Sequence, residues 1–286
     1  MPHSVLDIAA APARFHDDVR RGDLRRRGAR LLRISGGLWL ATAVFGQLLF
    51  ALYVAIFYGR AALQGRFQDW NKVLAHGYVP GDWFLNLVLG MHLLFVVLIV
   101  AGGALQLLPA LRRRAPAFHR WNGRLYLLSA AILSLGGLAL AWVRGTVGGA
   151  AQHVSVSLNA LLILVFAGIV WRLARERRVD AHRRWALRLF LAVSGVWFFR
   201  IGLMLWLAVH KAPVGFDPDS FTGPFLSFLG FAQYLLPLAV LELYLRVQDR
   251  GSPVAQVAVA GGVLVLTLMT LGGVLAATMG MWMPRL

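Results

Sequence analysis

Cysteine is absent from the 286 residues, and charged residues make up only 14% of them. The lack of thiols excludes disulfides, thiolate catalysis, iron–sulfur clusters and cysteine-ligated zinc, so histidine and carboxylate side chains remain as candidate ligands. Acidic residues are scarce: the chain has 12 Asp and Glu against 29 Lys and Arg, a formal net charge of +17. Because the basic residues lie between apolar runs and no base-stacking aromatics accompany them, we expect no nucleic-acid binding.

Apolar sequence is abundant, with 59% hydrophobic residues and a mean hydropathy of +0.67. Ordinary soluble domains are less apolar than this. A helix needs ~20 apolar residues to cross a bilayer, and seven runs meet that length. They cover residues 35–58, 83–109, 121–143, 151–172, 185–208, 225–246 and 254–278. The sequence therefore predicts an all-α, polytopic membrane helical bundle of about seven transmembrane helices in contact with the lipid bilayer.

The distribution of arginines predicts the orientation of the chain. Seven arginines lie between Arg20 and Arg33, and further groups of five, seven and two arginines fall in every second loop. The opposite side carries six basic residues, Arg60, Arg66, Lys72, Arg144, Lys211 and Arg285. By the positive-inside rule, we expect a bacterial inner-membrane protein with a cytoplasmic N-terminus and a periplasmic C-terminus. We predict a basic cytoplasmic arm over residues 1–34, not a cleaved signal peptide, and a single transmembrane helical domain over residues 35–286.

An internal repeat is the most informative pattern in the chain. The stretches beginning His119-Arg120-Trp121 and His182-Arg183-Arg184-Trp185 are rough copies of each other. One hydrophobic span upstream of each lies another histidine, His92 before the first copy and His153 before the second. The repeat predicts two helical hairpins, spans two–three and spans four–five, within a repeat core over residues 83–208.

These four histidines are the candidate functional residues, because histidine is rare inside bilayers and tends to mark function there. Pro116 suits a first helical turn and Asp180 suits an N-cap, so His119 and His182 are expected at the cytoplasmic starts of their helices. Counting ~1.5 Å per residue from the same face places the two upstream histidines roughly 27–29 Å higher. One pair is therefore expected near each face of the membrane.

Facing imidazoles on neighbouring helices are the ligand set of a bis-histidine haem, a cofactor that helix bundles commonly bury. The positive end of a helix dipole disfavours imidazolium, which favours the neutral state that iron requires. The leading interpretation is a haem b protein that exchanges electrons with a quinone or another redox protein. The candidate iron ligands are His92, His119, His153 and His182, and the candidate partners of the haem propionates are Arg124, Arg188 and Arg200.

Two features bear on this interpretation. Arg200 is the only basic residue well inside a predicted span. Because the carboxylates of the chain offer it no partner at that depth, an anionic ligand group is a candidate partner for its guanidinium. Five glycines would let either a flat macrocycle or another helix approach closely, namely Gly102, Gly103, Gly123, Gly136 and Gly137.

The alternative interpretation is a non-redox membrane protein, either a small-molecule permease or an accessory subunit. The histidines would then be polar lining or interfacial anchors. Outside the spans, Asp217 and Asp219 in the loop over residues 209–224 suit either a bound cation or a simple turn, and the abundance of turn formers favours the turn.

The chain also resembles a known family. His92, Gly102-Gly103, Gln106, Arg112-Arg113-Arg114, His119-Arg120 and Gly123-Arg124, followed by Ala181-His182-Arg183-Arg184-Trp185 and Arg188, resemble the bacterial family of predicted multi-pass membrane proteins called domain of unknown function 2306. The resemblance covers roughly residues 85–210 and departs from the family pattern at Ala104 and Ala186. It implies the class and the topology of the protein, and no activity.

A second resemblance concerns architecture alone. Four histidines on four consecutive helices are similar to the arrangement in the transmembrane two-haem cytochromes b that take electrons from ascorbate. In those proteins the first ligand pairs with the third and the second with the fourth. The resemblance implies a pair of His92 with His153 and a pair of His119 with His182.

Overall fold

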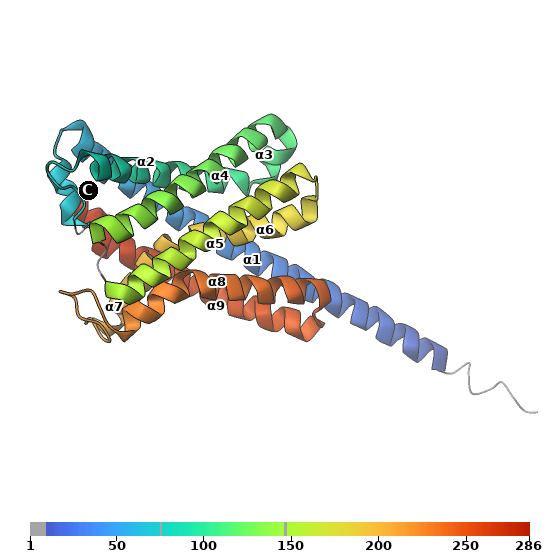
Figure 1. Cartoon of the computed structure of the whole chain (residues 1–286). Helices are drawn as coiled ribbons and strands as arrows, with labels where there is room; N and C mark the ends of the chain where they lie inside the picture. Colours follow the sequence, from blue (N-terminus) through green and yellow to red (C-terminus); the bar gives the residue numbers. More distant parts are fainter. Residues whose placement is uncertain (1–9, 75, 146–147) are drawn as a thin grey trace, which may run out of the picture. The chain divides into compact units, whose positions relative to one another are not determined.

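A computed structural model describes residues 10–74, 76–145 and 148–286, with side chains from residue 23 onward. In this part of the chain all regular elements are helices, and one isolated bridge joins Asp217 and Thr222. The α-helices are α1 (Ala10–Leu63), α2 (Trp83–Gln106), α3 (Pro109–Arg114), α4 (Pro116–Ala139), α5 (Gly149–Arg175), α6 (Val179–Val193), α7 (Gly195–His210), α8 (Pro224–Arg250) and α9 (Pro253–Ala277), as shown in Figure 1. The short 3-10 or π helices between and after them are η1 (Phe67–Lys72), η2 (Leu140–Gly145), η3 (Thr278–Trp282) and η4 (Met283–Arg285). The all-α prediction is confirmed.

Six of the helices are long and apolar enough to cross a membrane, and the bent pair α6–α7 makes a seventh if it forms one span. Large apolar side chains cover their outer faces, and several are more than half exposed, for example Leu87, Leu128, Leu135 and Leu161. Such apolar surface is too extensive for contact with water and fits contact with lipid tails. The chain is a multi-pass membrane protein.

The chain divides into two compact units, each described by itself. The first combines the described residues of Met1–Thr42 with Val240–Met269. In it, the hydroxyl of Tyr244 on α8 donates a hydrogen bond to the carbonyl of Leu32 on α1 at 3.3 Å. A side chain at Gly36 would lie 2.9 Å from that hydroxyl, so a glycine is required for this approach. The predicted basic arm is, where described, the start of the same continuous helix α1.

The second unit combines Ala43–Ala239 with Thr270–Leu286 and holds the predicted repeat. Helix α2 packs on α4, α4 on α5, and α5 on α6, so the two predicted hairpins lie next to each other (Figure 1). Asn122 on α4 connects the two helices of the first hairpin. Its Nδ2 donates hydrogen bonds to the carbonyl of Gly102 at 2.8 Å and to Oε1 of Gln106 at 3.0 Å, both on α2. A Cβ atom at Gly103 would lie 3.0 Å from the ring of Tyr126. These glycines therefore serve the close approach of α2 and α4.

The fifth predicted span is broken. Helix α6 ends at Val193, α7 begins at Gly195, and the two axes differ by 51°. The prediction of one continuous helix over residues 185–208 was wrong at this point. The hydroxyl of Ser194 donates to the carbonyl of Phe190 at 2.7 Å, and a hydroxyl that bonds back in this way bends helices, particularly beside glycine.

Two carboxylates order the loops outside the spans. Asp82 caps α2 by accepting a hydrogen bond from the backbone N–H of Leu85 at 3.1 Å, and it forms an ion pair with Arg144 at 2.8 Å. The hydrogen bond from Arg144 lowers the pKa of the Asp82 carboxyl below its ordinary value. Asp217 accepts hydrogen bonds from the backbone N–H groups of Asp219 and Ser220 at 2.8 and 3.3 Å. This geometry is that of a turn, in line with the turn interpretation of the 209–224 loop.

Candidate histidine site

His119 lies on the buried face of α4, one turn from its start. Pro116 occupies the first turn, as predicted, and the side chain of Gln106 on α2 donates to the backbone carbonyl of His119 at 3.1 Å. The buried face continues through Asn122 and Tyr126. His119 Nδ1 is buried and has no hydrogen-bond partner among the described residues. A buried ring nitrogen without a partner costs free energy unless a further group satisfies it.

His182 lies near the start of α6, where Asp180 is in the first turn and Arg178, not Asp180, holds the N-cap position. Its Nδ1 is 3.1 Å from the backbone carbonyl of Val170 on α5. Because a carbonyl only accepts hydrogen bonds, this contact assigns the proton of a neutral imidazole to Nδ1. Nε2 then carries the free lone pair. A ring nitrogen that donates to a backbone carbonyl in this way fixes the orientation of a metal-ligating histidine.

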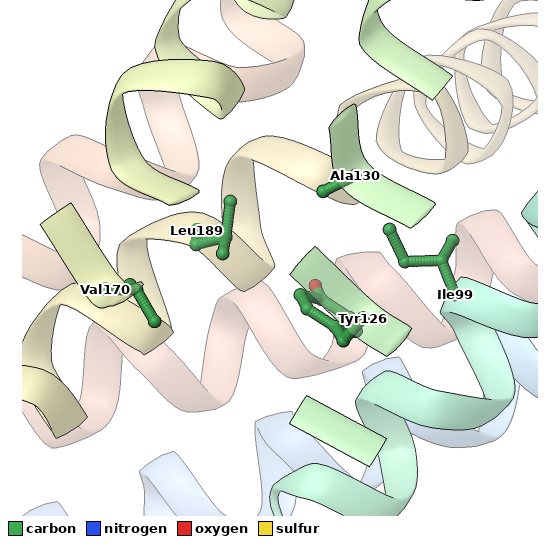
Figure 2. Packing of buried hydrophobic residues seen from close by; sticks show 5 residues of the cluster. All are labelled: Ile99, Tyr126, Ala130, Val170 and Leu189. Carbon is green, nitrogen blue, oxygen red and sulfur yellow. The ribbon is translucent and has the colours of Figure 1, made fainter. Parts of the chain in front are cut away.

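His182 is one of the side chains close enough to His119 to act on it electrostatically, together with Arg112 and Arg120. The two histidines belong to corresponding places in the two hairpins. Seven residues beyond His119 lies Tyr126, and seven residues beyond His182 lies Leu189; both belong to the hydrophobic core of the bundle. Figure 2 shows this core, which Ile99, Ala130 and Val170 complete. The histidine pair is therefore about two helical turns, ~10 Å, from the core along each helix.

The two repeat arginines are both stacked on tryptophan. The guanidinium of Arg124 lies 5.4 Å from the ring centroid of Trp121, and that of Arg188 lies 4.8 Å from that of Trp185. Both pairs have the same spacing of three residues, which puts the side chains on one helix face. The repeat thus extends from the sequence to equivalent local contacts. The histidines break its register by one residue, because His119 precedes its tryptophan by two residues and His182 by three.

His92 lies in the middle of α2 and rests on α4. A Cβ atom at Gly136 would be 3.8 Å from His92 Nδ1, and one at Gly137 would be 3.6 Å from Cε1. Both distances are ordinary van der Waals contacts, so the His92 ring packs on α4 at these two glycines without requiring them. Its Nδ1 is buried without a hydrogen-bond partner among the described residues.

Arg200 on α7 is close enough to His92 to interact with it electrostatically. Its Nη1 donates to the carbonyl of Val196 at 3.2 Å, and its guanidinium lies 5.3 Å from the ring centroid of Phe50. Its other charge contacts are the buried tyrosines Tyr53 and Tyr58. Within the described ranges no carboxylate forms an ion pair with Arg200. An anionic ligand group as the partner of Arg200 therefore stays a prediction.

His153 near the start of α5 lies against Trp142, with ring centroids 5.5 Å apart. The indole of Trp142 also donates to the hydroxyl of Ser157 at 2.8 Å. His92 and His153 thus have different neighbours, an arginine in one case and a tryptophan in the other. Their pairing stays a prediction.

Sequence reasoning missed a polar cluster at the break of the fifth span. Gln47 Nε2 donates to the hydroxyl of Ser194 at 2.9 Å, and Asn159 Nδ2 donates to the carbonyl of Ala192 at 3.2 Å. Asn159 Oδ1 is buried without a partner in the part of the chain that the structure describes. The adjacent Ser194 and Gly195 were the available signal, because such a pair weakens a helix.

Among the described residues, no three His, Asp or Glu side chains gather as a metal site. A bis-histidine haem does not need such a group, since the macrocycle supplies four of the six iron ligands. Neither of the two pockets described in the structure is lined by a histidine.

Comparison with known proteins identifies one family. Residues 89–218 match the model of the family described as predicted membrane protein, domain of unknown function 2306. The match covers somewhat less than half of the chain and includes all four candidate histidines and all three candidate arginines. Neither a curated protein nor a solved structure matches the chain.

Proposed function

We propose that this chain is a b-type haem protein that transfers electrons in the bacterial inner membrane. The observation that carries the proposal is that His119 and His182 lie near the starts of α4 and α6 and are close enough to interact electrostatically. In this proposal they are the axial ligands of a haem near the cytoplasmic face.

The donor atoms of this pair suit iron. His182 is oriented by the carbonyl of Val170, which leaves Nε2 with its lone pair. His119 has a buried ring nitrogen, Nδ1, without a hydrogen-bond partner among the described residues. Bound between them, a haem would supply one-electron chemistry by cycling between ferric and ferrous iron. The helices would supply the ligands and their orientation.

His92 and Arg200 support a second haem nearer the opposite face. Arg200 lies inside the bundle without a carboxylate, and a propionate is an anion that would pair with a guanidinium. His153 is the proposed second ligand of this haem. Arg124 and Arg188 are the proposed propionate partners on the cytoplasmic side, where each is already held on a tryptophan ring.

The electron partners would be a membrane quinone or another redox protein. Many apolar side chains on the outer helix faces are exposed, which would let a lipid-soluble carrier approach the bundle from the bilayer. The proposal assigns no direction to the electron transfer.

The test is the absorption spectrum of protein purified from haem-replete cells. We expect a Soret band and a reducible α band in wild type and in His210→Ala, a variant at an exposed histidine outside the candidate set. His119→Ala and His182→Ala should each lose part of the signal. A colourless wild-type protein, or full haem content in both variants, would disprove the proposal.

One observation favours the alternative of a small-molecule permease. The break at Ser194 interrupts a span beside buried polar side chains, and discontinuous spans of this kind form substrate sites in transporters. Gln233 on α8 is one of these buried side chains, since its Oε1 would lie 3.6 Å from a Cβ atom at Gly195. The absence of native cysteine allows a direct test with Ser194→Cys or Gln233→Cys. Labelling of these thiols by a water-soluble maleimide, together with a colourless wild type, would favour the permease. Unreactive thiols would exclude an aqueous pathway at the break.

A further inference from the structure

A small pocket of about 190 Å³ opens where α1 ends, and its lining is strongly basic. It is formed by the last turns of α1, the segment η1 and the end of the chain. The charged lining residues are Arg60, Arg66, Asp69, Lys72 and Arg285, and the apolar ones are Ile56, Phe57, Ala61 and Leu286. This pocket is remote in sequence from the histidines and does not depend on the proposed function.

Four of the six basic residues predicted on the periplasmic side line this one pocket. Of the other two, Arg144 is held in an ion pair with Asp82, and Lys211 lies in a different loop. The positive-inside rule makes basic residues rare on that face. These four residues therefore gather around one pocket, at whose rim Arg66 and Lys72 remain 60% and 67% exposed.

The charge in the pocket is not balanced by its own carboxylate. Asp69 is engaged with Lys72 at 2.6 Å and with Arg66 at 3.4 Å, and the hydrogen bond from Lys72 lowers the pKa of its carboxyl. Arg60 forms no ion pair within the described residues. Among the described residues, Arg285 donates a side-chain hydrogen bond to the backbone carbonyl of Met281 and forms no ion pair. Arg60 and Arg285 therefore have no ion-pair partner among the described residues and are available for an anion.

The apolar part of the lining indicates the kind of ligand. Ile56 is 40% exposed and Leu286 is 49% exposed, so apolar surface borders the cationic groups. Arginine forks bind phosphate oxygens with two parallel hydrogen bonds, which a single ammonium cannot do. A site with guanidinium groups beside apolar side chains at the end of a membrane helix fits a phosphate group with an apolar attachment.

We propose that this pocket binds a phosphate group on the periplasmic side of the membrane, through Arg60 and Arg285. The source of the phosphate is either a phospholipid headgroup or a free phosphate, and the chemistry of the pocket is the same for both. Asp69 acts as a positioning residue, because it holds Arg66 and Lys72 at the rim of the pocket.

The test uses the full-length protein in detergent and measures saturable binding of three probes. Dioctanoylphosphatidylglycerol represents the headgroup, inorganic phosphate represents the free anion, and dioctanoylglycerol has the same acyl chains without phosphate. We expect dioctanoylglycerol not to bind. Binding of the phospholipid alone would identify a headgroup site, whereas binding of inorganic phosphate with comparable affinity would identify a free-anion site.

The variants connect the binding to the pocket. Arg60→Gln with Arg285→Gln should weaken phosphate binding by about tenfold or more, since each substitution removes a charge-assisted hydrogen bond. Lys211→Gln removes one charge on the same predicted face but outside the pocket, and should change binding less than about twofold. The double variant Arg60→Lys with Arg285→Lys keeps the charge and replaces the glutamine variant if that variant does not fold. It should also weaken phosphate binding, because lysine cannot form the two parallel hydrogen bonds of a guanidinium group. No binding by wild type, equal binding of dioctanoylglycerol, or unchanged binding by the arginine variants would overturn the proposal.

Discussion

Gln47 donates a hydrogen bond to the hydroxyl of Ser194 across 2.9 Å, and Ser194 is the residue at which the fifth span breaks. The two residues are 147 positions apart in the sequence and both are buried. The bond therefore connects α1 to the junction of α6 and α7. It places a fully satisfied hydroxyl at the point where a continuous helix was expected.

Ser194→Ala should destabilise the folded protein by about 1–3 kcal/mol, because the amide of Gln47 would lose its acceptor in an apolar environment. Unfolding in mixed detergent micelles measures this loss. Gln47→Leu combined with Ser194→Ala should recover most of it, since removing both partners leaves no unsatisfied group. A double variant as unstable as the sum of the single variants would show that the two residues are not coupled.

Asp82→Asn should reduce the acid sensitivity of the protein. The hydrogen bond from Arg144 lowers the pKa of Asp82 from its ordinary value of 3.8. A carboxyl with a lowered pKa stabilises the folded state above that ordinary value, and the contribution is lost as the pH falls through the lowered pKa. The midpoint of thermal unfolding of wild type should therefore fall more steeply below about pH 4 than that of Asp82→Asn.

A matched control for that experiment is Asp219→Asn, which changes an exposed carboxylate that has no ion pair among the described residues. Its acid sensitivity should follow that of wild type. Identical pH profiles for wild type and Asp82→Asn would contradict the assignment of this stability to the ion pair.

The two predicted haems should be separable by substitution. His119→Ala and His182→Ala should each remove the same cytoplasmic-side haem, about half of the total, because an axial pair needs both ligands. His92→Ala should spare that haem. Haem quantification and redox titration of the purified variants measure these effects. Loss of all haem in each single variant would show that the sites are not independent.

Arg124→Gln and Arg188→Gln should retain haem but lower its midpoint potential, since removal of a nearby positive charge favours the ferric state. Both arginines are stacked on tryptophan, so Trp121→Leu and Trp185→Leu should shift the potential in the same direction through loss of the stacking. Unaltered potentials in all four variants would exclude a role of these side chains near the propionates.

A reporter enzyme fused after Leu286 tests the predicted orientation. Alkaline phosphatase requires export, so it should be active at this position and inactive when fused at Arg114 in the loop between spans two and three. The reverse activity pattern would show the opposite membrane orientation and would place the basic pocket on the cytoplasmic side.

The helices were predictable because their signal is local. The run over residues 83–109 corresponds to α2 (Trp83–Gln106), and Pro116 begins α4 as expected. Hydropathy along the sequence is enough to predict these helices, because it needs no knowledge of contacts between distant residues. The N-cap prediction at Asp180 failed by two residues, because Arg178 holds that position and Asp180 falls in the first turn.

The break at Ser194 and the pocket beside Arg60 were not predictable, because each depends on partners far away in the sequence. Ser194 is bonded to a residue on α1, and the pocket combines the end of α1 with the last residues of the chain. The repeat predicted equivalent places for His119 and His182 in two hairpins, and their role as a ligand pair stays a prediction. His92 and His153 have different neighbours, since Arg200 on α7 lies near His92 and Trp142 lies against His153.

The break at Ser194 divides the fifth span into two helices, α6 and α7, that are held by different contacts. Helix α6 is attached to α5 at both ends, by His182 on the carbonyl of Val170 and by Asn159 on the carbonyl of Ala192. Rotation about Ser194 would therefore swing α7, and Arg200 with it, while His182 stays in place. The two proposed cofactor sites would respond differently to such a motion, and the distance between them would change.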